Sequence, residues 1–244
     1  MRTLGILGGM SWESSAHLYK LLNQGMAARL GGLHSARLIL HSVDFAEIEA
    51  LQRSADWAAA AALLGRAGAG LKAAGAEGLL IATNTMHKVA DEIEALSGLP
   101  LIHIVDGTAT ALRAAGIERA GLLATAYTME QDFYRSRMAR HGIELLTPDA
   151  PGRAEVHRII YEELCRGRIV ADSRRFYEQQ VAALAAAGAQ AVILGCTEVC
   201  LLLDPATAST PVPLFDSTSL HAQAALDWIL AAPQSNKPVG DLKP

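Results

Sequence analysis

The sequence predicts an α/β protein with two pseudo-symmetric domains, each a parallel sheet flanked by helices, and a cleft between the domains. Short apolar runs alternate with helical segments along almost the whole chain, a pattern typical of parallel sheets covered on both faces. The chain also repeats itself, because residues 75–85 and 188–198 each run from small residues through an apolar strand to polar residues. Flanking segments repeat in the same order, residues 5–9 with 121–125 and residues 104–108 with 214–218. The matched pairs indicate two similar halves. The spacing between the copies is too long for the repeat of a solenoid protein.

The first half begins with a short buried strand that opens into a glycine-rich turn and a helix. Ser11 or Ser14 is expected to cap this helix. We expect strands at residues 4–8, 36–43, 78–82 and 100–105. We expect helices at residues 15–30 and 55–74, a third that ends near residue 96, and a fourth at residues 107–115. The turn lacks the spacing of a nucleotide-binding motif, but its free N–H groups suit a substrate carboxylate.

The second half repeats this plan. We expect strands at residues 120–124, 143–146 and 211–215, a further strand directly before Cys196, and helices at residues 129–141, 154–166, 173–187 and 221–230. Pro100 and residues 204–211 are the expected crossing points between the domains. Residues 232–244 carry Pro, Gly, Ser and Lys without an apolar period, so this tail is expected to be disordered.

Composition narrows the class of protein. The chain has 244 residues, of which 51% are hydrophobic and 19% charged, a globular composition with ample core. A net charge of −4 without a basic stripe argues against a nucleic-acid partner. No apolar run is long enough to span a membrane, and the first residues lead into a strand instead of a signal sequence, so we expect a cytoplasmic protein. The 3 cysteines and scattered histidines predict neither a disulfide framework nor a metal site.

Cys196 is the leading candidate for a reactive group. It follows a predicted buried strand, and ligands of open α/β sheets bind just beyond the carboxyl ends of the strands. A free cysteine is often only a small buried apolar residue. The start of a helix, however, is expected to lower the pKa of this thiol and favour the thiolate. Thr83, Asn84 and Thr85 would alone be read as helix caps, but the repeat places Thr83 opposite Cys196.

Four segments resemble the aspartate/glutamate racemase family: Leu-Gly-Gly-Met-Ser-Trp-Glu-Ser at 7–14, Thr-Asn-Thr at 83–85, Thr-Ala-Tyr-Thr-Met at 125–129 and Gly-Cys-Thr-Glu at 195–198. The likeness covers about residues 1–231, and Thr-Asn-Thr-Met-His is similar to the L-aspartate/glutamate-specific members. The resemblance implies cofactor-independent racemisation of an amino acid in the cleft of a homodimeric protein. It also implies that the domains exchange segments, so that residues 1–99 with 209–231 form the first domain and residues 100–208 the second.

The resemblance implies a role for each candidate residue. Cys196 and Thr83 would exchange the Cα proton on opposite faces of the substrate. Most members carry cysteine in both places; the threonine hydroxyl is a far weaker acid, which predicts a strong imbalance between the two directions. Asn84, Thr85 and Thr197 would donate to the α-carboxylate. A side-chain carboxylate would need a partner such as Gln52, Arg53 or Arg166. The remaining candidates for substrate binding are Met10, Ser11, Thr125, Tyr127 and Glu198.

Two other functions remain open. One is a related single-cysteine enzyme, a malonate decarboxylase or a maleate isomerase, because a decarboxylase needs a single proton donor. The other is a non-catalytic relative that only binds an acidic amino acid, which would keep its ligand after Cys196 is replaced by alanine.

Overall fold

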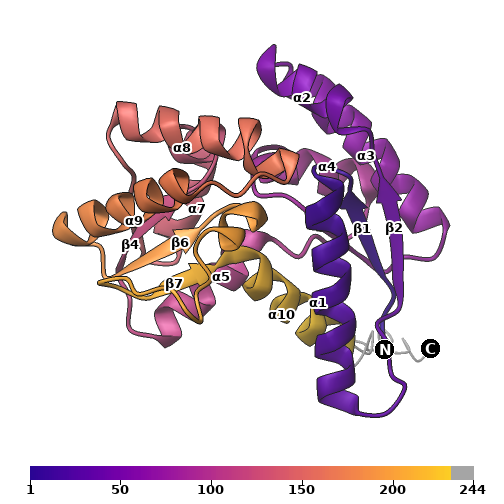
Figure 1. The fold of residues 1–244 in the computed structure, drawn as a ribbon. Coiled ribbons are helices and arrows are strands. Elements are labelled where there is room, and N and C mark those ends of the chain that lie inside the picture. The colour runs from indigo at the N-terminus through magenta and orange to yellow at the C-terminus, as the bar shows by residue number, and fades with distance from the viewer. Residues whose placement is uncertain (232–244) are drawn as a thin grey trace, which may run out of the picture.

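Two parallel sheets flanked by helices make up the protein, as the sequence predicts (Figure 1). The computed structural model describes residues 1–231, and the tail expected to be disordered, residues 232–244, lies outside this range. Within the described residues, no helix is long and apolar enough to cross a membrane.

The first sheet has the strand order β2-β1-β3. Its strands are β1 (Leu4–Gly8), β2 (Leu38–Ser42) and β3 (Gly78–Ile81), all parallel, with Leu4 opposite both Leu38 and Gly78. Helices α1 (Trp12–Leu30), α2 (Phe45–Arg53), α3 (Trp57–Ala73) and α4 (Ala90–Ser97) accompany it, with the 3₁₀ helix η1 (Thr85–Val89). β1 and β3 are buried along their whole length, as their continuous apolar sequences predict.

The second sheet has the strand order β5-β4-β6-β7. Its strands are β4 (Arg119–Leu123), β5 (Glu144–Leu146), β6 (Ala191–Leu194) and β7 (Leu214–Asp216). Its helices are α5 (Ile104–Ala114), α6 (Ala126–Glu130), α7 (Asp132–Arg140), α8 (Ala150–Glu162) and α9 (Ala171–Ala186), with the 3₁₀ helices η2 (Leu164–Arg166) and η3 (Thr197–Leu201). β1 and β4 are thus the matching interior strands of the two sheets, and β3 and β6 are their matching neighbours.

The last segment is shared between the two domains. We expected residues 209–231 to accompany the first domain, but β7 pairs with β6 in the second sheet. Helix α10 (Ser217–Leu230) then leaves that sheet and runs towards α1 (Figure 1). Ala222, Leu226 and Ile229 of α10 are buried in one apolar cluster with residues of β1 and α1. The segment divides at Ser217 because its strand finds a hydrogen-bonding edge in one domain and its helix an apolar face in the other.

The predicted strand at residues 100–105 is reduced to a single bridge between Leu101 and Leu79. Helix α5 begins earlier than expected, at Ile104, because the side chain of His103 caps it by accepting a hydrogen bond from the Val105 N–H. Residues 101–104 therefore form a short crossover between the two domains. The parallel strands of each sheet end at the same edge, which brings the turns after β3 and β6 to the cleft.

Candidate active site

Thr83 and Cys196 line one cavity of about 40 Å³ between the two domains. Thr83 follows β3 and Cys196 follows β6, as the internal repeat predicts. Gly195 permits the second turn, because a Cβ at this position would lie 2.8 Å from the Cβ of Ala124. The structure therefore brings the two candidate catalytic residues to one site.

The Cys196 thiol is hydrogen-bonded to a carboxylate from its own turn. Its Sγ donates to Oε2 of Glu198 over 2.9 Å. Oε1 of the buried Glu198 accepts from Ser11 Oγ at 2.6 Å and from Ser14 Oγ at 2.7 Å. Both serines lie at the start of α1, so the first domain holds the carboxylate that contacts the thiol of the second.

The thiol is the resting form of Cys196, contrary to the expected thiolate. Burial raises the pKa of Cys196 well above its ordinary value of 9.0, and the nearby Glu198 carboxylate raises it further. The backbone N–H of Glu198 acts in the opposite direction but is the weaker influence. The following helix, η3, has only 5 residues. Its N-terminus therefore does not outweigh burial and a neighbouring negative charge.

Thr83 has different surroundings. Its side chain is half-buried and lines the cavity. Its carbonyl oxygen lies 2.8 Å from Nδ1 of His87. A threonine hydroxyl is a far weaker acid than a thiol, so a difference in acidity between the two faces of the cavity remains the prediction.

Asn84 presents an acceptor to the cavity. Ser217 Oγ has one hydrogen, which it donates to the Leu194 carbonyl oxygen at 2.9 Å. Ser217 must therefore accept from Asn84, whose Nδ2 lies 3.2 Å away. The Oδ1 atom of Asn84 is then buried without a partner, although the residue lines the cavity. Ser217 engages one of the two amide hydrogens of Asn84, and the second remains available for the predicted donation to a carboxylate.

Besides Thr83, three threonines line the cavity: Thr85 of the first domain, and Thr125 and Thr197 of the second. Thr85 Oγ1 of the first domain lies 3.0 Å from Thr125 Oγ1 of the second, and Thr128 completes this cluster. Thr197 Oγ1 lies 2.7 Å from Thr218 Oγ1 at the start of α10. Neutral donors from both domains are therefore close to the thiol.

An aromatic and amide wall closes the cavity. Tyr161 of α8 donates from its hydroxyl to Gln52 Oε1 at 3.1 Å, and its ring stacks on Phe45 with centroids 6.3 Å apart. Gln52 Nε2 also lies 3.1 Å from the Met86 sulfur. The sequence indicated Gln52 and Met10 but missed the cavity-lining residues Ser14, Phe45, Ile160, Tyr161 and Cys165. Ile160 and Tyr161 belong to the apolar face of α8. The spacing of apolar residues along a helix does not show whether they line a cavity or pack in the core.

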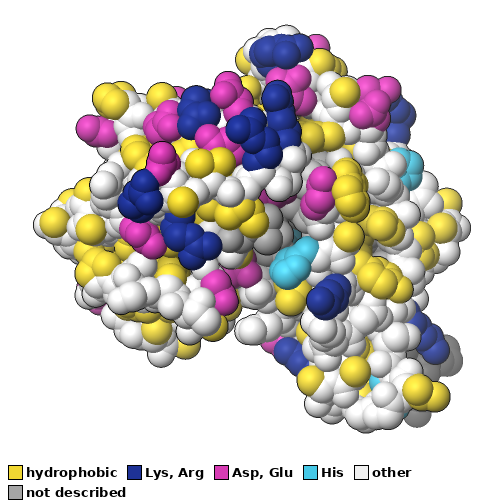
Figure 2. Space-filling view, in the orientation of Figure 1, with side chains coloured by type: hydrophobic (Ala, Val, Ile, Leu, Met, Phe, Trp, Pro, Cys, Tyr) yellow, Lys and Arg dark blue, Asp and Glu magenta, His cyan; other side chains and the backbone are white. Residues whose placement is uncertain are grey.

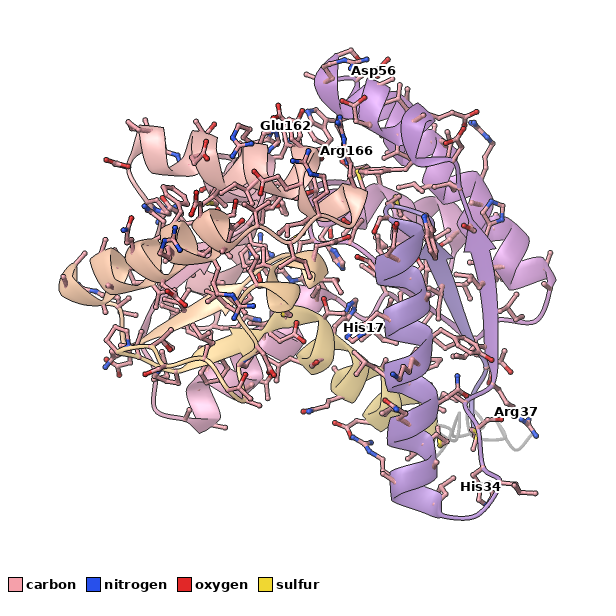
Figure 3. All side chains as sticks on the ribbon, viewed as in Figure 1. His17, His34, Arg37, Asp56, Glu162 and Arg166 are labelled. Carbon is pink, nitrogen blue, oxygen red and sulfur yellow. The ribbon has the colours of Figure 1, made fainter. Side chains whose placement is uncertain are left out.

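Three predicted substrate contacts do not line the cavity. Ser11 instead positions Glu198, and Tyr127 packs against Trp57, with ring centroids 5.8 Å apart. Arg166 is exposed and lies beside the end of α8 nearest the first domain (Figure 3). The cavity lining drawn from residues 1–231 includes no Lys, Arg or His.

Lys and Arg side chains are interspersed with Asp and Glu on the outer surface of both domains (Figure 2). Arg53, the alternative to Gln52, is also exposed, and it pairs with Glu49 at 3.3 Å. In the described part of the chain, no group of three His, Cys, Asp or Glu side chains is arranged to hold a metal ion.

The chain belongs to the Asp/Glu/hydantoin racemase family, whose model matches residues 7–225. The resemblance carried by the four sequence motifs is thus confirmed. A Yersinia pestis protein with a provisional assignment as an Asp/Glu racemase is 53% identical, covering 95% of this chain and 100% of its own, with a TM-score of 0.87. An aspartate racemase homologue from Pyrococcus horikoshii OT3 is 29% identical over 94% of this chain and 99% of its own, with a TM-score of 0.81. The Picrophilus torridus aspartate racemase shares the fold, with 21% identity over 93% of this chain and 94% of its own, and a TM-score of 0.72.

Proposed function

We propose that this protein racemises aspartate or glutamate without a cofactor, moving the Cα proton between Cys196 and Thr83. The observation that carries the proposal is the Cys196 thiol, hydrogen-bonded to Glu198 and sharing a cavity with Thr83. Inverting a stereocentre requires a proton acceptor on one face of the substrate and a donor on the other. Two pseudo-symmetric strand ends supply such a pair.

The step at Cys196 begins from a thiol, because its pKa is raised. The S–H proton passes to Glu198 Oε2, and the resulting thiolate removes the Cα proton of the substrate. The electron pair of the broken C–H bond moves to Cα and is shared with the α-carboxylate. Glu198 therefore deprotonates the Cys196 thiol, and the thiolate in turn deprotonates the substrate. In this proposal Glu198 activates Cys196, whereas the sequence led us to expect a substrate contact.

The step at Thr83 delivers a proton to the opposite face of Cα. Its hydroxyl proton goes to the carbanion, and water resupplies the oxygen while the proton on Glu198 returns to solvent. Starting the reaction from this side is harder, because a threonine hydroxyl is a far weaker acid than a thiol. The imbalance affects rates and isotope exchange only, since a catalyst cannot move the equilibrium between enantiomers.

The remaining polar groups suit the rest of an amino acid. Thr85, Thr125 and Thr197 supply hydroxyl donors for an α-carboxylate that gains negative charge during the reaction. The unpartnered Oδ1 of Asn84 suits the α-ammonium group, which is a donor only. Gln52 is the neutral hydrogen-bonding group nearest to Tyr161 at the other wall. We propose that it binds the side-chain carboxylate.

Substrate must part the two domains to enter. A cavity of about 40 Å³ has room for little more than water molecules, which need about 10–15 Å³ each on this scale. The contacts that would separate are hydrogen bonds between the domains, Thr85 with Thr125 and Gln52 with Tyr161. The domains then close on the substrate and exclude water from the carbanion.

Proton NMR in deuterated buffer tests the proposal. Each enantiomer of aspartate and glutamate is incubated with the protein, loss of the Cα–H signal is followed, and chiral chromatography measures inversion. Exchange with inversion that Cys196→Ala abolishes and Cys200→Ala retains would support the racemase. Exchange and inversion absent with all four substrates would refute it and direct the same assay to malonates and maleate. The expected homodimer also remains a proposal, which light scattering tests.

A further inference from the structure

Three buried histidines meet beneath Thr83, at the crossover between the domains. The ring of His87 lies 4.5 Å from that of His103 and 5.6 Å from that of His221, measured between centroids. All three are buried, and none lines the cavity that contains Thr83 and Cys196. The reaction described above does not use them.

The hydrogen bonds of His87 fix which ring nitrogen carries the proton. The Ile104 backbone N–H can only donate, and it donates to Nε2 of His87 over 3.2 Å. Nε2 is therefore unprotonated, and Nδ1 carries the hydrogen. The Thr83 carbonyl oxygen can only accept, and it lies 2.8 Å from Nδ1. His87 thus connects the backbone of Thr83 to the first residue of α5.

The other two histidines hold the same crossover. His221 donates from Nε2 to the Ile102 carbonyl oxygen over 2.6 Å, and His103 Nδ1 accepts from the Val105 N–H over 3.2 Å. Burial lowers the pKa of His87 well below 6.5, so its ring stays neutral and keeps both hydrogen bonds at neutral pH. The turn that carries Thr83 is therefore anchored to the segment that joins the two domains.

We propose that His87 is a positioning residue that holds Thr83 at the distance and angle needed to protonate the carbanion on the face opposite Cys196. The inference rests on the proposed racemisation and adds a residue to it. His87 acts through the Thr83 backbone, so its loss impairs protonation on the Thr83 face and leaves proton removal by Cys196 in place. A displacement of about 1 Å can cost a catalytic step about a hundredfold.

The test compares His87→Leu, which removes both hydrogen bonds, with His87→Gln. In histidine, Nδ1–H and Nε2 flank one ring carbon, and in glutamine the N–H donor and the oxygen acceptor are bonded to one amide carbon. Glutamine can therefore replace both hydrogen bonds of His87. In deuterated buffer, deuterated substrate of retained configuration reports Cys196 alone, and deuterated product of inverted configuration reports delivery by Thr83. We expect His87→Leu to lower the ratio of inverted to retained product about ten- to hundredfold, and His87→Gln to recover most of it. His103→Asn, which has no bond to Thr83, is the matched control and should keep the ratio of the parent protein.

Equal loss of both products in His87→Leu, or an unchanged ratio, would overturn the positioning role. If the unmodified protein forms neither product, the proposed racemisation itself is refuted. Nitrogen-15 NMR of the unmodified protein supplies an independent check, because it does not depend on whether the variants fold. Its His87 signals should report a neutral ring protonated at Nδ1, and protonation at Nε2 would refute the geometry.

Discussion

The Glu198→Gln variant should lose racemisation while its Cys196 thiol becomes more reactive towards an alkylating reagent. Glutamine has nearly the shape of glutamate and keeps an oxygen that Ser11 and Ser14 can hold. It removes the negative charge that helps to raise the pKa of Cys196, and it removes the base that takes the thiol proton. Loss of the charge should speed alkylation of the thiol, and loss of the base should slow racemisation. One substitution therefore separates the two roles of Glu198.

The size of each effect follows from the hydrogen bond that is lost. A hydrogen bond to a charged group contributes about 1.5–3 kcal/mol, which corresponds to roughly a ten- to hundredfold change in an equilibrium constant, so the pKa of Cys196 should fall. The thiolate fraction at fixed pH then rises about ten- to hundredfold, while the lower basicity reduces the reactivity of each thiolate, for a net gain of about three- to tenfold. Loss of the base should lower the rate of racemisation by about a hundredfold or more.

Iodoacetamide labelling followed by peptide mass spectrometry measures the first effect, and exchange at Cα measures the second. Peptide resolution separates Cys196 from Cys165, whose pKa burial raises to about 12. Ser14→Ala is the matched control, because it removes one donor to Glu198 and leaves the charge, so labelling should not accelerate. Slower labelling of Glu198→Gln, or racemisation at the original rate, would refute the assigned role of this carboxylate.

Three further outcomes are expected. Thr83→Cys should raise the ratio of inverted product to retained exchange by at least about tenfold, because a thiol is a far better proton donor; an unchanged ratio, compared with Thr83→Val as control, would exclude Thr83 as the donor. Tyr161→Phe should raise KM about three- to tenfold with little change in kcat, since it removes one hydrogen bond to Gln52 across the cleft; a loss confined to kcat would contradict this. His103 has a pKa lowered by burial from 6.5 to about 3, so the unfolded chain binds a proton that the folded protein does not, and stability falls as the pH drops from about 6.5 towards 3. His103→Asn keeps an acceptor for the Val105 N–H and should remove about 1.4 kcal/mol of this loss per pH unit, as measured by urea unfolding at pH 7 and pH 5; parallel losses in both proteins would refute it.

The paired strand ends were predictable because the signals that define them are local. The apolar runs before Thr83 and Cys196 have strand length, and polar residues follow each run directly. Parallel strands end at one edge of a sheet, so the repeat was enough to place both residues at the cleft. The bounds of the crossover were less predictable, because α5 begins where His103 caps it and not where the apolar period begins.

The fold class, the repeat and the positions of Thr83 and Cys196 after matching strands therefore follow from the sequence, since periodicity and residue type act over a few neighbouring positions. Tertiary structure alone decided the resting state of the thiol, because burial depends on everything packed around it. It also decided the role of Glu198, whose serine partners are 184 and 187 residues away in sequence, and the orientation of Asn84, which depends on the single hydrogen of Ser217. Contacts of this kind have no local signal, because they form only when distant segments pack against one another.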